Sequence, residues 1–254
     1  MAANTPTKSI WLTGSLCILA CTSACANTTH LKDRSEYRAP YASSAPSVDG
    51  VADEAIWNQA GWRELDQRWL GPEYTSDDFS GRFKVVWTEK KLYLLAEITD
   101  DILIDTHRNP LTQYWDDDCI EIFLDENYSG GNHQYNHNAF AYHVSLDNQT
   151  VDIGSDEKPR NYSRHIDSSW KQHGDTIIWE LAISIYNDAY TDGSDNNVPV
   201  TLTPGKILGL MVAYCDNDGS EVRENFIGSE AVLEGSASRG WIDADIFGKL
   251  ILDK

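Results

Sequence analysis

Residues 114–125 read YWDDDCIEIFLD, an aromatic pair and three acids followed by a short apolar run. The apolar run predicts a strand, because β-branched and aromatic residues bounded by Asp clusters are typical of strands. Alternation places Ile120 on an apolar core face and Glu121 on the opposite face, on the side of Trp115. Such a pair can hold a sugar, since the indole covers the C–H face of a pyranose and the carboxylate accepts hydrogen bonds from its hydroxyls. A core tryptophan beside a solvated acidic turn is the alternative interpretation.

A second set of polar residues lies on other predicted strands. Residues 139–146 alternate cleanly, which places His143 and Ser145 together on an outward face. Carboxylates at strand-to-loop junctions offer the hard oxygen ligands that calcium takes, although the sequence has no EF-hand spacing and solvated turns are the commoner explanation. The four acids in question are Asp100, Asp101, Asp216 and Asp218.

Short strands are the elements that must position these residues. Residues 83–88 and 92–99 predict a hairpin by their period, composition and loop length. Further strands are predicted at residues 176–185, 207–214 and 247–252. Residues 61–81 are expected to form a loop, and Asp53 is expected to cap a short helical turn. Many short strands without a convincing helical period predict an all-β protein, a β-sandwich.

The net charge and the length of the chain limit its number of domains and the kinds of partner it can bind. The chain has 254 residues, with 40 acids, 20 bases and a formal net charge of −20. This length fits one large domain together with processing segments. The charge repels phosphate backbones and anionic lipids, so we expect no nucleic-acid partner. A neutral or cationic ligand suits such a protein, and its oligomeric state stays open.

Residues 1–26 are expected to be an export signal. Lys8 supplies its positive charge, and the apolar run at residues 10–20 is too short to span a bilayer comfortably. The segment ILAC resembles a lipobox, which makes Cys21 the candidate for lipidation; Cys25 is a second candidate, and plain cleavage nearby is a third possibility. We therefore expect a lipoprotein of the outer membrane, facing the periplasm or the cell surface, or a secreted protein. Its membrane contact would be through the lipid alone.

The rest of the chain divides into a tether and a folded domain. Residues 27–46 are polar and show no periodicity, so we expect them to form a flexible tether. Residues 47–254 contain the predicted strands and form the folded domain. Cys119 and Cys215 lie in this domain, where they could pair if their strands are neighbours or remain two separate thiols.

Four segments together resemble the family 9 carbohydrate-binding module over residues 47–252. They are, in order, VDGVADEAIW, KVVWTEKKLYLLAEITDD, WDDDCIEIFLD and GWIDADIFGKLIL. The resemblance implies an immunoglobulin-like antiparallel β-sandwich that binds saccharides without catalysis. It further implies that the ligands are the ends of plant-type chains such as cello- or xylo-oligosaccharides, and that structural calcium is often present.

The resemblance also implies which residues meet the sugar. The two clamp tryptophans of the family fall on Trp115 and Trp241, and its acid falls on Glu121. The polar pair of its middle strand falls on His143 and Ser145, where well-known members of the family carry an arginine and an asparagine. This departure removes a forked cation that could bind two neighbouring hydroxyls, so the preferred sugar stays open. We expect micromolar or weaker affinity.

The sequence also contains residues that two other functions would need. A glycoside-active enzyme would need two carboxylates, for which Glu121 and one of the acids at residues 116–118 are available, but acids so close on one strand do not readily flank a glycosidic bond. A b-type haem protein would need axial ligands, for which Met211 and the histidines are available, but Met211 lies in an apolar strand where a core role is usual. A purely structural surface protein is the remaining alternative.

Overall fold

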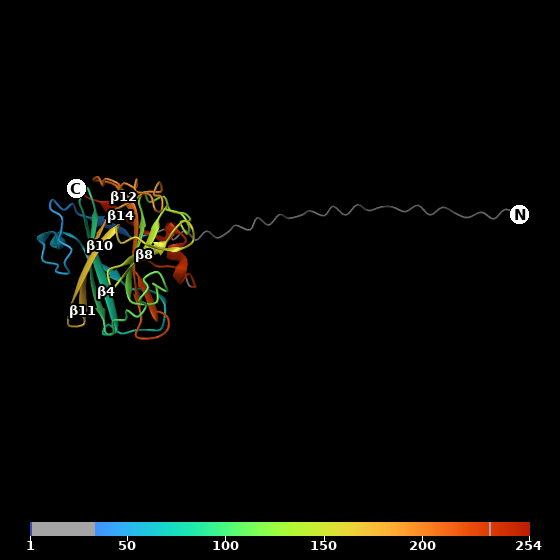
Figure 1. Ribbon diagram of the computed structural model, residues 1–254, viewed down its shortest axis with the longest axis horizontal. Helices are drawn as coiled ribbons and strands as arrows, with labels where there is room; N and C mark the ends of the chain where they lie inside the picture. The colour runs from blue at the N-terminus through green and yellow to red at the C-terminus, as the bar shows by residue number, and fades with distance from the viewer. Residues whose placement is uncertain (2–33, 234) are drawn as a thin grey trace. The chain divides into compact units, whose positions relative to one another are not determined.

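The computed structural model describes Met1 and residues 34–233 and 235–254. The predicted export signal, the lipidation site at Cys21 and the first part of the predicted tether lie outside the described residues and stay predictions. The described residues from 34 to 254 form one compact unit, and Figure 1 shows its strands arranged in two layers. Within the described part of the chain, no helix has the length and apolarity needed to cross a membrane.

The larger sheet follows the order β1 (Glu36–Ala39), β14 (Gly248–Leu252), β12 (Ile207–Asp216), β6 (Cys119–Asp125), β7 (Phe140–Ser145), β8 (Thr150–Ile153) and β9 (Pro159–Asn161). In the same sheet, β13 (Asn225–Gly228) pairs with both β12 and β3 (Gln67–Leu70). The smaller sheet follows the order β10 (Ile166–His173), β11 (Thr176–Ile183), β5 (Leu92–Asp100), β4 (Phe79–Trp87) and β2 (Arg63–Leu65). All pairings are antiparallel among the described strands except that of β1 with β14. The predicted β-sandwich is confirmed.

The main core fills the space between the two sheets. Alternate residues of the central strands supply it, as the period of a pleated strand requires, with Trp87 and Trp179 from the smaller sheet and Tyr142 and Tyr214 from the larger. Ile120 and its alternate neighbours on β6 belong to this core, as predicted. The two layers are thus held together mainly by apolar burial.

A second apolar cluster covers the other face of the larger sheet. Phe123 and Met211 lie in it, and the short 3₁₀ helices η2 (Ala237–Trp241) and η3 (Ala244–Ile246) pack over it. Both faces of β6 are therefore buried, and the residues expected to emerge into solvent instead lie beneath a covering layer. Met211 has the core role that its apolar strand suggests.

Three local expectations differ from the structure. Residues 36–39 lie within the predicted tether but form β1, because β14 provides a parallel partner from the far end of the chain. The stretch at residues 61–81 is not one loop, since β2, β3 and the start of β4 lie in it. The helical turn is η1 (Ala55–Gln59), preceded by Glu54 at the N-cap position without a side-chain cap, so Asp53 does not cap it.

Candidate functional site

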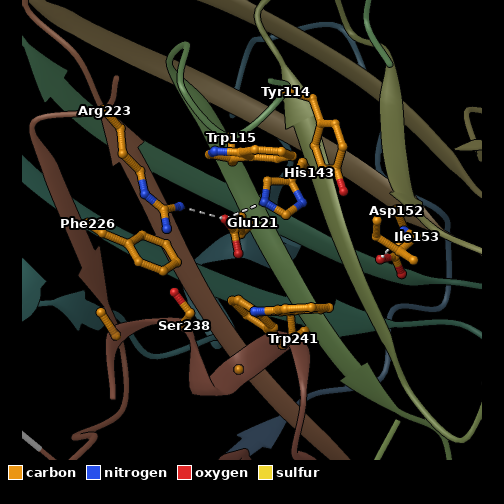
Figure 2. Close-up of a pocket in the computed structure, with 13 residues that line it drawn as sticks. Tyr114, Trp115, Glu121, His143, Asp152, Ile153, Arg223, Phe226, Ser238 and Trp241 are labelled. Atoms are coloured by element: carbon orange, nitrogen blue, oxygen red, sulfur yellow. Dashed lines mark hydrogen bonds and ion pairs between the residues drawn. The ribbon is translucent and has the colours of Figure 1, made fainter. Parts of the chain in front are cut away.

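A cavity of about 280 Å³ opens on the face of the larger sheet that η2 partly covers. It is lined by side chains from β6, β7, β8, the β12–β13 connection and η2 (Figure 2). The lining residues are Tyr114, Trp115, Glu121, Phe123, His143, Asp152, Ile153, Arg223, Phe226, Ala237, Ser238, Gly240 and Trp241. Four of the five predicted ligand residues are therefore brought together around one cavity.

Two tryptophans form opposite walls of this cavity. Trp115 precedes β6 in a turn and is 38% exposed, whereas Trp241 ends η2 and is partly buried against the second apolar cluster. Figure 2 shows the two indoles nearly edge-on, one on each side of the opening. Tyr114 supports the first wall through an edge contact, with ring centroids 4.9 Å apart. The arrangement leaves a slot with an aromatic surface on either side.

The polar floor of the slot is built around Glu121. Its Oε1 lies 2.5 Å from His143 Nε2 and 3.3 Å from Arg223 Nη1. Cys215 donates its thiol to the same oxygen at 3.3 Å. His143 Nδ1 faces the Ala141 carbonyl oxygen at 3.2 Å, so both ring nitrogens meet oxygen acceptors. A carboxylate, an imidazole and a guanidinium thus form one connected group below the tryptophans.

The charge of Glu121 is stabilised despite its burial. Burial of the side chain raises its pKa, but the neighbouring His143 and Arg223 more than offset this, and the net shift is downward. For Arg223, burial lowers the pKa, yet the facing Cys215 and Glu121 raise it overall. The site therefore presents an ionised carboxylate whose charge is compensated within the protein.

Sequence reasoning missed Arg223. Its guanidinium lies 3.9 Å above the ring centroid of Phe226, a cation–π contact that fixes its plane. It supplies a forked cation from the β12–β13 connection, although the expected middle-strand position holds His143 instead. The available signal was that Arg223 is the only basic residue between Lys206 and Arg239.

Ser145 does not line the cavity. It ends β7, and its hydroxyl donates to Asp147 Oδ1 at 2.5 Å within the turn that follows. Alternation correctly puts Ser145 on the same face as His143, but two residues along a strand move a side chain by roughly 6–7 Å. That displacement carries Ser145 past the rim, so a contact with the same sugar ring is not supported.

The three acids before β6 face the loops and do not line the cavity. Asp117 Oδ2 accepts hydrogen bonds from the backbone N–H groups of Thr106 and His107, and Asp118 accepts from those of Ile104 and Asn217. These bonds hold the connection from β5 to β6, and with it the turn that carries the first tryptophan. A second carboxylate does line the cavity, that of Asp152, whose Oδ2 accepts from Ala141 N–H at 2.8 Å. Burial raises the pKa of Asp152 to about 8.

A family model described as "Carbohydrate family 9 binding domain-like" matches residues 48–254. The chain belongs to this family. The resemblance stated from four sequence segments is thereby confirmed.

Relatives of this family 9 chain include proteins named as xylanases and as an exoglucanase, which are much longer than it. An endo-1,4-beta-xylanase C of Paenibacillus barcinonensis is 34% identical over 82% of this chain, but the match spans 16% of the relative. Exoglucanase XynX of Acetivibrio thermocellus is 29% identical over 76% of this chain and 17% of its own length. The chain therefore matches only about one-sixth of each relative.

Solved structures share the fold of the family 9 chain. A family 9 module from Caldicellulosiruptor kristjanssonii in complex with cellotriose has a TM-score of 0.64 at 23% identity, covering 86% of this chain and 93% of that one. The same module in complex with glucose has a TM-score of 0.65 at 22% identity, covering 86% and 95%. At these identities the likeness shows the fold.

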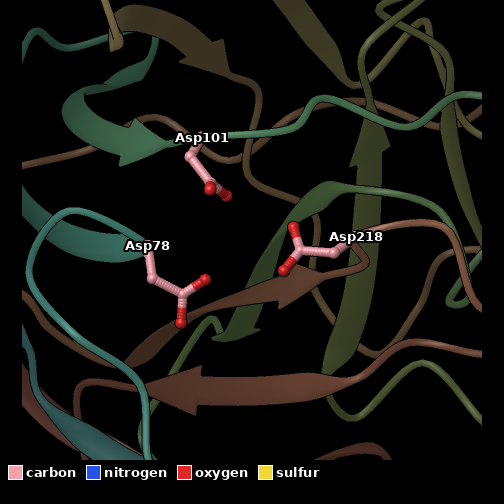
Figure 3. Close-up of side chains that lie close together, drawn as sticks. All are labelled: Asp78, Asp101 and Asp218. Atoms are coloured by element: carbon pink, nitrogen blue, oxygen red, sulfur yellow. The ribbon is translucent and has the colours of Figure 1, made fainter.

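The family 9 chain also gathers acids at one end of the sandwich. Carboxylate oxygens of Asp100, Asp216 and Asp218 lie within 4.8 Å of one another, and so do those of Asp78, Asp101 and Asp218 (Figure 3). Asp218 Oδ1 is buried without a hydrogen-bond partner. An orphaned buried oxygen among other carboxylates fits a hard cation such as calcium.

All four acids predicted for calcium belong to these two overlapping groups. Asp78 is an addition that the sequence did not indicate, because it precedes β4 in a stretch expected to be a loop.

The two domain cysteines lie opposite each other. Cys119 on β6 and Cys215 on β12 are directly paired in the strand register. Both are buried and free. Their strands are neighbours, as a disulfide would require, but the two thiols form no disulfide and lie beneath the floor of the cavity.

Proposed function

We propose that this protein binds saccharides without catalysis, with the sugar ring held between Trp115 and Trp241. One observation carries the proposal: two indoles from distant parts of the chain face each other across a cavity whose floor is polar. An aromatic face covers the apolar C–H surface of a pyranose, while carboxylate, imidazole and guanidinium groups meet its hydroxyls. The arrangement suits a neutral ring of this kind better than a flat or a highly charged ligand.

The ligand class follows from the same geometry. The ionised carboxylate is already compensated by His143 and Arg223, so the floor offers hydrogen bonds at little net charge. The cavity is near the lower end of the range of about 300–1,000 Å³ that is usual for ligand pockets, which suits the end of a saccharide chain. Family 9 neighbours that hold glucose and cellotriose support β-linked glucose or xylose chains as the ligands. Because hydroxyls must lose water first, affinity should be about micromolar or weaker.

The placement of the carboxylates supports a non-catalytic role. Glycoside hydrolysis usually needs two carboxyl groups that flank the scissile bond. The acids that precede β6 hydrogen-bond to loops, and Glu121 Oε1 is in contact with His143 and with the guanidinium of Arg223. Asp152 is the remaining carboxyl group of the lining, and both its oxygens accept backbone N–H bonds. The xylanase relatives match only in a small part of their length, which agrees with a binding module attached to separate catalytic domains.

Tryptophan fluorescence tests this function. We expect a soluble cello- or xylo-oligosaccharide to change the emission of the protein in a saturable way, and Trp115→Ala or Trp241→Ala to abolish the change. Trp62→Phe is the matched control, because Trp62 packs against Arg82 and Lys84 of the smaller sheet and does not line the cavity. A broad glycan panel that gives no saturable signal with the wild type would sink the proposal.

Calcium and export are two further parts of the proposed function. The acids around Asp218 would hold a calcium ion that links the ends of β5 and β12 with the segment before β4, supplying structural rather than chemical help. The predicted signal would export the protein, and lipidation at Cys21 would attach it to a membrane. Mass spectrometry of the mature N-terminus distinguishes a diacylated Cys21 from plain cleavage.

A further inference from the structure

An exposed tyrosine flanks the outer wall of the cavity. Tyr135 lies in the loop between β6 and β7, and 39% of it is exposed. Its ring centroid is 6.1 Å from that of Trp241, with the planes inclined by 67°. Tyr135 is not among the residues that line the cavity, so it extends the aromatic surface past the rim.

The loop that carries Tyr135 is fastened to the segment that carries Trp241. The backbone N–H of His133 donates to the Ile242 carbonyl oxygen at 3.0 Å, and His133 Nε2 lies 2.7 Å from the Gly240 carbonyl oxygen. A β-bridge between Asn132 and Asp243 adds to these bonds. Because these bonds tie the loop directly before Tyr135 to residues 240–243, the rings of Tyr135 and Trp241 keep a fixed relation without a ligand.

The size of the cavity indicates which part of a saccharide would meet the surface formed by Tyr135. At about 280 Å³, it accommodates the end of a saccharide, and further rings must leave through the opening. A chain that leaves along the wall formed by Trp241 meets the exposed face of Tyr135 next. A tyrosine covers apolar C–H groups with its ring and meets hydroxyls at its tip, which suits a solvent-exposed second ring.

We propose that Tyr135 forms an outer subsite, against which the second pyranose ring of an oligosaccharide rests while the first is held between the tryptophans. This inference rests on the proposed function. It predicts that affinity rises with chain length and that Tyr135 supplies the increase.

Calorimetric titrations with glucose, cellobiose and cellotriose test the subsite. In Tyr135→Ala, we expect binding of cellobiose and cellotriose to weaken about five- to tenfold, as burial of one ring face predicts, while glucose affinity stays within about twofold. Tyr135→Phe keeps the ring and should bind all three sugars within about twofold of the wild type. Tyr41→Ala is the matched control, since Tyr41 is 37% exposed and makes a similar edge contact with Trp87 at 4.9 Å. It should change none of the affinities.

Three results would overturn the subsite alone, and a fourth would remove the saccharide function with it. Unchanged cellotriose binding in Tyr135→Ala shows that the ring does not touch the ligand. An equal loss for glucose and cellotriose shows that Tyr135 only positions Trp241. A wild-type protein that binds none of the three sugars removes the saccharide function itself, and the subsite with it, whereas binding of glucose with no gain from longer chains removes the subsite alone.

Discussion

Glu121 holds the polar floor together because His143, Arg223 and the Cys215 thiol all contact its one carboxylate oxygen, Oε1. Its carboxylate faces His143 Nε2 and Arg223 Nη1, and its side chain is almost fully buried. If one partner of a buried ionic group is removed, the opposite charge stays buried without a counter-charge. This lowers the free energy of unfolding by more than the intact ion pair contributes to it. The same carboxylate is the acceptor offered to a sugar hydroxyl, so stability and binding depend on the same atom.

Glu121→Gln should therefore lower both properties. We expect the free energy of unfolding to fall by about 3 kcal/mol, because the buried guanidinium of Arg223 loses its counter-charge and His143 loses a charged hydrogen-bond partner. Chemical denaturation measures this, and titration with cellotriose measures the loss of affinity. Glu97→Gln is the matched control, since Glu97 pairs with Arg82 at a half-exposed site and should cost at most about 1 kcal/mol. Equal losses in the two variants would contradict the central role of Glu121.

The expected residue set and the observed one differ for reasons of distance and register. Alternation along β7 identifies the face on which His143 lies, but it does not say how far along the strand a sugar reaches. The sequence therefore also predicts Ser145 as a ligand-binding residue. Arg223 follows β12, and it reaches Glu121 because β12 pairs with β6, a long-range register that no local pattern contains. The tryptophans could be named because the family resemblance, and not periodicity, places them.

The element that carries Trp241 is a single turn of 3₁₀ helix pressed onto the sheet. Gly240 is buried there, and a Cβ at this position would lie 2.7 Å from Phe123 Cε1 and 2.8 Å from Met211 Cε. The absence of a side chain thus allows η2 to approach β6 and β12 closely. The depth of the cavity depends on this approach, because η2 forms one of its walls.

Gly240→Ala should move η2 outward and weaken sugar binding. Overpacking of this kind costs about 1–3 kcal/mol of stability, and the displaced Trp241 should lose affinity for cellotriose. Thermal unfolding and calorimetry measure the two effects. Gly61→Ala is the control, because a Cβ at Gly61 would meet no atom within 4 Å. Unchanged affinity in Gly240→Ala would show that the wall position does not depend on this contact.

His165, which lies between β9 and β10, links β7 to the segment that follows β11. His165 Nδ1 lies 2.8 Å from the Tyr142 hydroxyl and its Nε2 lies 3.1 Å from that of Tyr190. Burial, assisted by the nearby His137 and opposed by Asp192, lowers the pKa of His165 to about 4 from 6.5. The folded state therefore favours the neutral imidazole.

This shift predicts acid sensitivity within a defined window. Between pH 6.5 and pH 4 the imidazole of His165 is protonated in the unfolded state but not in the folded state. The free energy of unfolding therefore falls as the pH decreases through this range. Below about pH 4 both states are protonated, and the effect of His165 on the free energy of unfolding no longer changes with pH. The full effect is about 3 kcal/mol. His165→Gln should reduce the slope of unfolding free energy against pH in this window by about one proton. An unchanged slope would mean that other groups set the acid response.

At the scale of the molecule, the acidic group lies where strands of both sheets end, and these sheets are held together mainly by apolar burial. Asp100 ends β5 in the smaller sheet, and Asp216 ends β12 in the larger. The Tyr214 hydroxyl already donates to Asp100 Oδ2 at 2.6 Å across the sandwich. A cation held here would add a second link between the sheets and neutralise carboxylates that otherwise repel one another.

Calcium should therefore raise the thermal midpoint of the chelator-treated protein. A ligand at about 100 times its Kd stabilises by about 2.7 kcal/mol, which corresponds to several degrees for a domain of this size. Asp218→Asn should remove most of the response, whereas the exposed Asp195→Asn should keep it. An absence of any shift on addition of calcium to the wild type would exclude the proposed structural ion.

The global fold was predictable because its central strands carry strong local signals. The hairpin of β4 and β5 follows from alternation and a short polar loop, and β6 and β12 follow from their apolar runs. The edge strands were missed, since β1, with the sequence EYRA, acquires its structure only from a partner at the opposite end of the chain.

The pairing of β1 with β14 determines where the chain can be shortened without exposing a new sheet edge. The family match begins at residue 48, yet β1 lies ahead of it, and the following segment covers Trp87 through backbone bonds from Pro40 and Ala42. A shortened chain starting at the matched boundary would leave one side of β14 without its neighbour. Open strand edges recruit other molecules, so such a fragment, with the longer and more apolar β14 at its edge, should self-associate more readily than the full unit.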